Sequence, residues 1–76
     1  MKTKSEIIEA ITKGVNDDLD ITIYVYRKSD NYKTSVANIL GNTDTVESYI
    51  DEMEEEIHSL VEFKNWEIAG YDFEIE

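Results

Sequence analysis

The clearest hydrophobic pattern in the chain is a strict alternation of apolar and polar positions near residue 20. Its apolar positions are Leu19, Ile21, Ile23 and Val25. Because successive side chains of a strand point to opposite faces, this alternation predicts a strand over residues 19–26 with one buried face. A polar turn at residues 27–31 and a weaker alternation over residues 32–40 predict that a second strand forms a hairpin with the first. Val36 and Ala37 are adjacent apolar residues, as are Ile39 and Leu40, and either a β-bulge or an edge position in the sheet would explain this irregularity.

The segment before this hairpin has helical periodicity, because its apolar residues recur three and four positions apart. Thr3 and Glu6 have the spacing of a capping box, which marks a helix N-terminus. Gly14 suits the position just past a helix C-terminus. These signals predict a first helix over about residues 4–13.

A longer amphipathic helix is predicted over residues 45–62. Asp44 and Glu47 have capping-box spacing, so we expect Thr43 or Asp44 to cap its N-terminus. Its apolar side chains fall within an arc of about 120°, which is typical of a helix that packs one side on a core. They are Val46, Tyr49, Ile50, Met53, Ile57, Leu60 and Val61.

The last segment alternates in two phases, which predicts a third strand. Trp66 and Ile68 belong to the first phase, and Tyr71, Phe73 and Ile75 belong to the second. Gly70 lies where the phase changes, and a glycine there indicates a bulge. The element order is therefore α-β-β-α-β, in one small acidic domain over residues 1–76. We expect a two-layer α+β fold with a three-stranded, mainly antiparallel sheet in the order 2-1-3 and both helices on one face.

Charge is distributed unevenly along the chain. Residues 1–40 carry six acids and six bases, whereas residues 41–76 carry twelve acids and one base, Lys64, which accounts for the whole net charge of -11. A small domain needs a net charge of magnitude only about 2–8 for solubility, with both signs mixed. The asymmetry therefore indicates a surface for a cationic partner. It disfavours direct binding to nucleic acid or to an anionic membrane.

The acids of the predicted long helix lie opposite its apolar stripe. The candidate partner-binding residues among them are Glu47, Asp51, Glu54, Glu55 and Glu62. Five acid pairs in this helix stand three or four positions apart, and each pair destabilises it by roughly 0.2–0.5 kcal/mol. A helix selected only for solubility would alternate Glu with Lys, so this face predicts a binding surface. A plain solvated face is the alternative.

The third strand is expected to carry a second row of candidate partner-binding carboxylates. They are Asp72, Glu74 and Glu76. Strand geometry spaces them by about 6.5–7 Å, similar to the step between phosphates along a nucleic-acid strand. Tyr24, Tyr26 and Tyr32 are expected on the sheet face away from the helices, as an aromatic contact patch or simply as residues that favour strands. The sequence does not decide whether the long helix, the third strand or both would meet a partner.

The residues predict no catalytic site, no cofactor and no metal site. The chain has no Cys and a single histidine, His58, with no partner at the spacing of a nucleophile and its base. The Asp residues around position 18 lack the spacing and the glycine of a calcium-binding loop. No apolar run approaches the length of a membrane span, so we expect a cytoplasmic protein. Because no residues have catalytic spacing, we also expect that it is not an enzyme.

In size, acidity and clustered carboxylates, the chain resembles the small phage-encoded inhibitors of host defence, the anti-CRISPR and anti-restriction proteins. The residues that carry this resemblance are Asp44, Glu47, Asp51, Glu52, Glu54, Glu55, Glu56, Glu62, Asp72, Glu74 and Glu76. The resemblance covers the C-terminal half and is one of charge and size without a shared motif. It implies a nucleic-acid mimic that occupies the basic nucleic-acid-binding groove of a CRISPR effector, a restriction enzyme or another host nuclease.

Two other functions fit the same sequence. An immunity protein or antitoxin would use the same electrostatics against a basic nuclease toxin. A homo-oligomeric interaction domain would pair through the tyrosine face or the edge of the third strand, as in a homodimer, and its charge would serve only solubility. The identity of the partner and the oligomeric state stay open at the level of the sequence.

Overall fold

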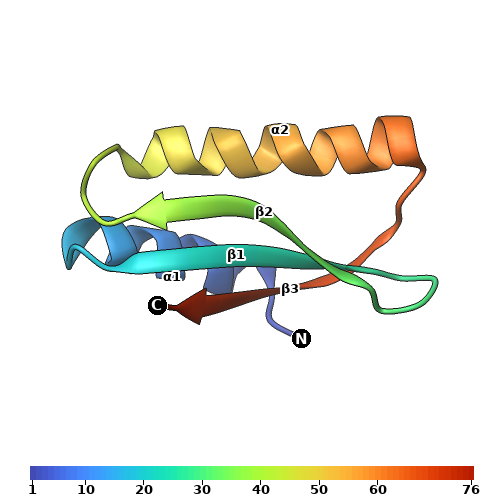
Figure 1. The fold of residues 1–76 in the computed structure, drawn as a ribbon, viewed down its shortest axis with the longest axis horizontal. Coiled ribbons are helices and arrows are strands. Elements are labelled where there is room, and N and C mark those ends of the chain that lie inside the picture. The colour runs from blue at the N-terminus through green and yellow to red at the C-terminus, as the bar shows by residue number, and fades with distance from the viewer.

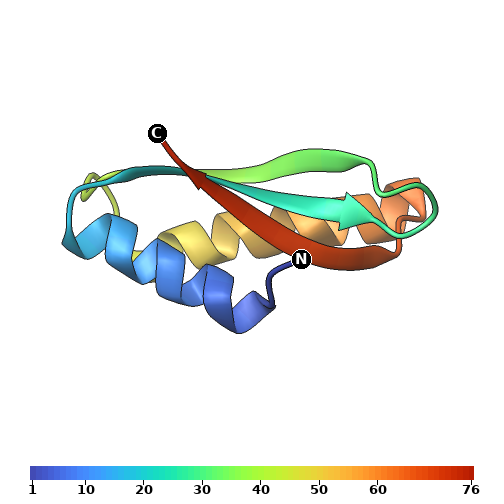
Figure 2. The same ribbon diagram turned by 90° about the horizontal axis from the view of Figure 1, so that it is seen from below.

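The computed structural model describes residues 1–76 as two helices packed on one three-stranded sheet (Figure 1). In chain order the elements are α1 (Lys4–Asn16), β1 (Asp20–Arg27), β2 (Lys33–Leu40), α2 (Val46–Lys64) and β3 (Ile68–Ile75). The sheet has the order β2-β1-β3, and β1 pairs antiparallel with both neighbours. Figure 2 shows both helices on the same side of the sheet, running in opposite directions. The predicted α+β fold and strand order are confirmed.

The hydrophobic core lies between the helices and the inner face of the sheet. Its largest fully buried side chains are Ile7 and Ile11 of α1, Ile21, Ile23 and Val25 of β1, Ile39 of β2 and Met53 of α2. Burying one such side chain contributes about 1.5–3 kcal/mol relative to leaving it in water. β1 therefore supplies the largest share of these side chains and α1 the next largest.

The irregular alternation of β2 coincides with a β-bulge, and β2 is also an edge strand, so both explanations that the sequence leaves open apply. Ile23 pairs with Ala37 and Tyr24 pairs with Ser35, which leaves Val36 without a partner on β1. The extra residue lets the adjacent side chains of Val36 and Ala37 both be buried.

A second bulge lies close to the predicted place in β3. The register with β1 shifts between Tyr26 and Arg27, and the unpaired residue of β3 is Ala69, next to Gly70. A Cβ on Gly70 would lie 2.7 Å from Sδ of Met1. The glycine therefore lets the N-terminal residue lie against the strand.

The predicted end of α1 is wrong. The helix continues past Gly14, and the amide of Asp17 donates to the carbonyl of Lys13 beyond it. Gly14 is buried inside the helix, where a Cβ would lie 3.0 Å from Cδ1 of Ile21 and 3.1 Å from Cγ2 of Ile39. Close packing of α1 on the sheet explains this glycine, because a side chain would push the helix away.

The predicted cap of α2 is also wrong, by one or two residues. Neither Thr43 nor Asp44 is the N-cap; Thr45 is, and its hydroxyl accepts from the amide of Ser48 at 3.1 Å. Asp44 instead accepts from the hydroxyl of Ser48 at 3.0 Å. At its other end α2 stops at Asn65, which adopts a left-handed conformation with φ of 57°.

Candidate functional site

The outer side of α2 carries four of the eight predicted partner-binding residues, Glu47, Asp51, Glu55 and Glu62. The apolar stripe of α2 packs on the core, which leaves the opposite side of the helix in solvent. Glu47, Asp51 and Glu55 follow one another there at four-residue intervals, and all three are exposed. Because an α-helix rises 1.5 Å per residue, these carboxylates stand at steps of about 6 Å along the helix axis.

Six exposed carboxylates of α2 make no ion pair with any base of the chain. These residues, named here the acidic face of α2, are Glu47, Asp51, Glu52, Glu55, Glu56 and Glu62. Like charges three or four residues apart repel, and the pairs within this face cost the helix about 1–2 kcal/mol. Only Glu47, in the first turn, is offset by the positive end of the helix dipole.

Glu54 is the exception among the predicted helix residues. Its carboxylate forms an ion pair with Nζ of Lys4 on α1. This hydrogen bond raises the pKa of the Lys4 ammonium. Glu54 is only partly exposed and lies on the side of α2 that meets α1, so it joins the two helices and belongs to the fold.

Asp72 of β3 lies on the open face of the sheet, which the helices leave uncovered, and it is bound by three groups of the chain. Its Oδ1 accepts from the amide of Phe73 at 2.8 Å and from Nζ of Lys2 at 3.1 Å. Its Oδ2 accepts from the hydroxyl of Tyr26 at 3.1 Å. The Phe73 amide and then the Lys2 ammonium hold the pKa of this carboxyl below its usual value. Asp72 therefore fastens the N-terminal segment and β1 to β3.

Glu74 and Glu76 are also bound by other parts of the chain. Nζ of Lys33 lies 3.1 Å from Oε1 of Glu74, and this hydrogen bond raises the pKa of Lys33. The hydroxyl of Tyr24 donates to Oε2 of Glu74 at 3.4 Å. The hydroxyl of Thr22 donates to Oε1 of Glu76 at 2.5 Å. Each of the three carboxylates of β3 therefore forms an ion pair or a hydrogen bond with a side chain of β1, β2 or the N-terminal segment.

The two predicted rows of carboxylates lie apart. Figure 1 shows α2 and β3 at opposite long sides of the molecule, with β2 and β1 between them. The helix row faces solvent on the outside of the helical layer, whereas the strand row lies on the open face of the sheet. Only the helix row offers carboxylates that the chain does not already use.

Tyr24 and Tyr26 lie on the open face of the sheet, but the predicted position of Tyr32 is wrong. The first two are partly buried, and their hydroxyls bind the strand carboxylates. Tyr32 precedes β2 in the hairpin turn, and its ring packs edge-on against buried Trp66 at 6.0 Å between centroids. Tyr32 therefore covers one end of the core and is not part of an aromatic patch with the other two.

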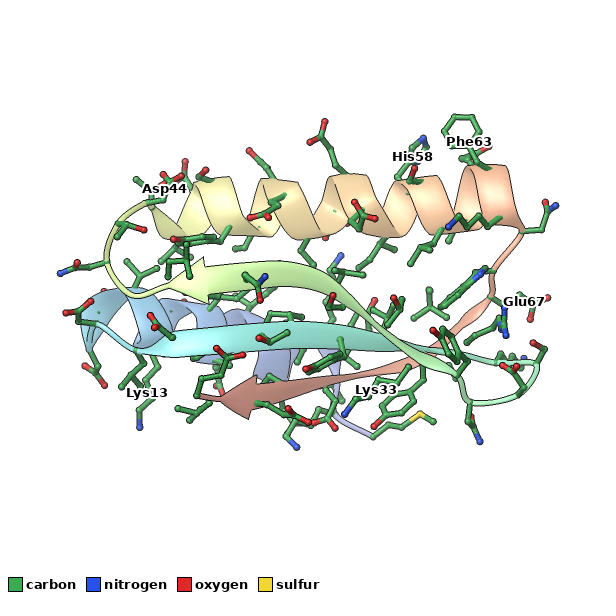
Figure 3. All side chains as sticks on the ribbon, in the orientation of Figure 1. Lys13, Lys33, Asp44, His58, Phe63 and Glu67 are labelled. Atoms are coloured by element: carbon green, nitrogen blue, oxygen red, sulfur yellow. The ribbon has the colours of Figure 1, made fainter.

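Phe63 is a candidate contact residue that the sequence prediction does not include. It lies in the last turn of α2 and is 79% exposed, more than any other large apolar side chain. Figure 3 shows Phe63 and His58 projecting from α2 on the side away from the sheet. They line a shallow, open hollow together with Asp51, Glu55 and Ser59. Counted at 100° per residue, Phe63 falls outside the apolar arc of the helix, which is the signal that marks it in the sequence.

The outer edge of β3 is partly capped by the chain itself. The amide of Lys2 donates to the carbonyl of Tyr71 at 2.8 Å, and the amide of Tyr71 donates to the carbonyl of Lys2 at 3.2 Å. Phe73 directs its amide to the same outer edge as Tyr71, because alternate residues of an antiparallel strand do so, and Asp72 binds that amide. Free strand edges are what a second copy would pair with, so this capping disfavours a homodimer through β3.

The charged side chains do not converge on a metal site, since no group of three or more His, Asp or Glu residues stands close enough to hold an ion. None of the helices combines the length and the apolar character needed to cross a membrane. Comparison of the chain with protein-family models, with curated proteins and with solved structures finds no match. What the site can do follows from its geometry and charge alone.

Proposed function

We propose that the protein is a non-enzymatic inhibitor whose acidic face of α2 occupies the basic nucleic-acid-binding groove of a target protein. One observation carries this proposal. The chain has seven bases and pairs five of them with acids, yet none of the five pairs involves the six carboxylates of that face. An arrangement that served only the fold would place bases where the repulsion is greatest.

The physics of the proposed complex is that of phosphate binding. A groove that binds nucleic acid neutralises phosphates with Lys and Arg side chains. The row of Glu47, Asp51 and Glu55 offers anionic oxygens at steps of about 6 Å on a rigid helix. Bases of the target would relieve the repulsion within α2 on binding. Long-range attraction would also speed association, and salt would weaken it.

The target class that fits is a host nuclease, such as a CRISPR effector or a restriction enzyme, met in the cytoplasm. Binding is stoichiometric and includes no chemical step, no cofactor and no direct contact with nucleic acid or membrane. Asp72, Glu74 and the tyrosines of β1 serve the fold in this proposal. A cognate nuclease toxin would be held by the same face, so the identity of the captured protein separates an inhibitor from an immunity protein.

Affinity capture with matched charge variants tests the proposal. Tagged protein is incubated with nuclease-treated host lysate at low salt, washed with rising salt, and the retained proteins are identified by mass spectrometry. The test variant carries Glu47→Lys, Asp51→Lys and Glu55→Lys, which leaves the Glu54–Lys4 ion pair intact. The control variant carries Glu9→Lys, Asp17→Lys and Asp20→Lys. These three exposed acids have no ion pair and lie outside α2, so the change in net charge is the same.

We expect the wild type and the control to retain a nucleic-acid enzyme that salt releases, and the test variant to lose it. A close charge pair across an interface contributes about 1.5 kcal/mol or more, and about 1.4 kcal/mol corresponds to a tenfold change in affinity. Reversing three carboxylates should therefore weaken binding by at least about a hundredfold. Equal loss in both variants would mean that net charge alone attracts the partner. Retention by the test variant would remove the acidic face of α2 from the interface.

A further inference from the structure

Phe63 continues the row of acids on α2. Glu47, Asp51, Glu55, Ser59 and Phe63 follow one another at four-residue intervals. Residues four apart form a ridge that winds around a helix by about 40° at each step, so this ridge crosses the exposed half of α2 diagonally and Phe63 lies about 80° around the helix from Glu55. From the first to the last of them the helix rises by about 24 Å. One end of the ridge therefore carries three carboxylates, and the other end carries an exposed aromatic ring.

The fold does not explain why Phe63 is exposed. Its ring makes no stacking contact with another aromatic ring and no contact with a cation of the chain. It is not among the side chains that pack against the core. Its neighbours in the hollow on the outer side of α2 include the carboxylates of Glu55 and Glu56. Aromatic rings at such positions are the residues that contribute most when a partner buries them.

A row of carboxylates that ends in a free ring matches a single strand of nucleic acid better than a duplex. Within a duplex the base faces are stacked on one another, so proteins meet phosphates and base edges. Proteins that bind single strands combine a basic groove along the backbone with aromatic side chains that stack on the faces of unstacked bases. On α2 the carboxylates stand for the phosphates, and Phe63 stands for the unstacked base.

We propose that the groove which receives α2 is a single-stranded nucleic-acid site, and that Phe63 occupies the stacking position that otherwise holds a base. This inference rests on the proposed function, because it takes the acidic face of α2 as the surface that enters the groove. It adds the kind of site and one residue, Phe63, that charge alone does not select. It also requires the target to have an aromatic or guanidinium group on which Phe63 can stack. This group would lie about 12 Å, measured along the axis of α2, from the Lys or Arg side chains that bind Glu55.

Competitive release from immobilised protein tests the inference. Partner retained from nuclease-treated lysate is eluted with single-stranded oligo(dT) or with a duplex of mixed sequence, at equal phosphate concentrations. Parallel columns carry Phe63→Ala, Phe63→Trp and Ile75→Ala. Ile75 is the matched control, because it is a large apolar side chain, 55% exposed, on a different element.

We expect the single strand to release the partner at a concentration at least about tenfold below that of the duplex. Phe63→Ala should weaken retention by about tenfold or more, since stacking on one base has an effect of that size. Phe63→Trp and Ile75→Ala should retain the partner like the wild type. Equal or better release by the duplex, or undiminished retention by Phe63→Ala, overturns the inference.

The failure of this inference can be told apart from failure of the proposed function. If Phe63→Ala retains the partner and the Glu47, Asp51 and Glu55 charge reversal does not, the acidic face binds without the ring and only the inference is lost. If the wild type retains no nucleic-acid-binding protein, both proposals are overturned. Folding of Phe63→Ala is not at risk, because the side chain makes no core contact.

Discussion

The acids of α2 and the acids of β3 have the same charge but opposite relations to the fold. On β3, Asp72 and Glu74 bind the ammonium groups of Lys2 and Lys33 and accept further hydrogen bonds from tyrosines. On α2, the acidic face repels itself and meets only water. Clustered negative charge can therefore support folding in one part of a small domain and burden it in another. The partners of each carboxylate, and not its position in an acidic run, tell the two apart.

The placement of the bases maintains this difference. Lys4 reaches α2 but binds Glu54, at the side that faces α1. Lys64 lies in the last turn of α2, where a positive charge favours the negative end of the helix dipole. Neither is paired with the acidic face, so its negative field is left to act on other molecules.

The substitution Asp72→Ala is the strongest way to test the β3 side of this comparison. It removes the acceptor for the Phe73 amide, the Lys2 ammonium and the Tyr26 hydroxyl. Because buried or partly buried donors then lose their partner, we expect the free energy of unfolding to fall by about 1–3 kcal/mol. Urea denaturation followed by circular dichroism measures the change. The control Glu52→Ala, on the acidic face of α2, should not lower the free energy of unfolding, because the substitution removes repulsion with Glu55 and Glu56.

Acid releases the same contacts without a substitution. The pKa of Asp72 is held below its usual value of 3.8, chiefly by the Phe73 amide. A carboxyl with a lowered folded pKa contributes stability above its unfolded pKa and loses that contribution as the pH falls through the folded pKa. We therefore expect the Phe73 amide resonance to titrate together with the Asp72 carboxyl, with a midpoint below pH 3.8. A midpoint at or above that pH would show that the amide does not hold the carboxylate.

On α2, replacing an acid by a base should stabilise the protein. Asp51→Lys turns three repulsive pairs, with Glu47, Glu54 and Glu55, into attractive ones and should raise the free energy of unfolding by about 1–2 kcal/mol at low salt. The gain should shrink as salt screens both kinds of pair. The same variant should bind the partner more weakly than the wild type. A loss of stability on this substitution would mean that the acidic face supports the fold.

The smallest effect is expected for Glu74→Gln. Its ion pair with Lys33 is more than half exposed on the glutamate side, and exposed pairs contribute only about 0.2–1 kcal/mol. The pKa of Lys33 should move back toward its usual value, because the hydrogen bond that Lys33 donates to Glu74 raises it. Titration of the Lys33 side chain by NMR measures that return. An unchanged Lys33 pKa would remove Glu74 as its partner.

Much of the fold could be predicted because its signals are local. The alternation of residues 19–26, the capping box of Thr3 and Glu6 and the apolar arc of α2 are each set by neighbours in the sequence. The adjacent apolar pair in β2 also marked the place where its pairing is irregular. Period and spacing are sufficient for these features, because strand and helix geometry fix which residues share a face.

The features that the sequence did not reveal depend on residues that are distant along the chain. From its residue type, Gly14 is predicted to follow the end of the first helix. The structure explains it instead by the close packing of Ile21 and Ile39 from the sheet. From the alternation of β3, Asp72 is predicted to lie in a solvent-facing row of carboxylates. Its partner Lys2 is 70 residues away along the chain, so no local pattern shows their contact. Spacing cannot show such contacts, so it could not separate the free carboxylates of α2 from the bound ones of β3.

The most direct test of this separation compares two neutralised variants in urea at low and high salt. One carries Glu52→Gln, Glu55→Gln and Glu56→Gln on α2, and the other carries Asp72→Asn and Glu74→Gln on β3. We predict that the α2 variant is more stable than the wild type by about 1 kcal/mol at low salt, and that high salt removes the difference. The β3 variant should be less stable at both salt concentrations. An α2 variant that is less stable than the wild type at low salt would contradict the claim that the acidic face is held free of the fold for a partner.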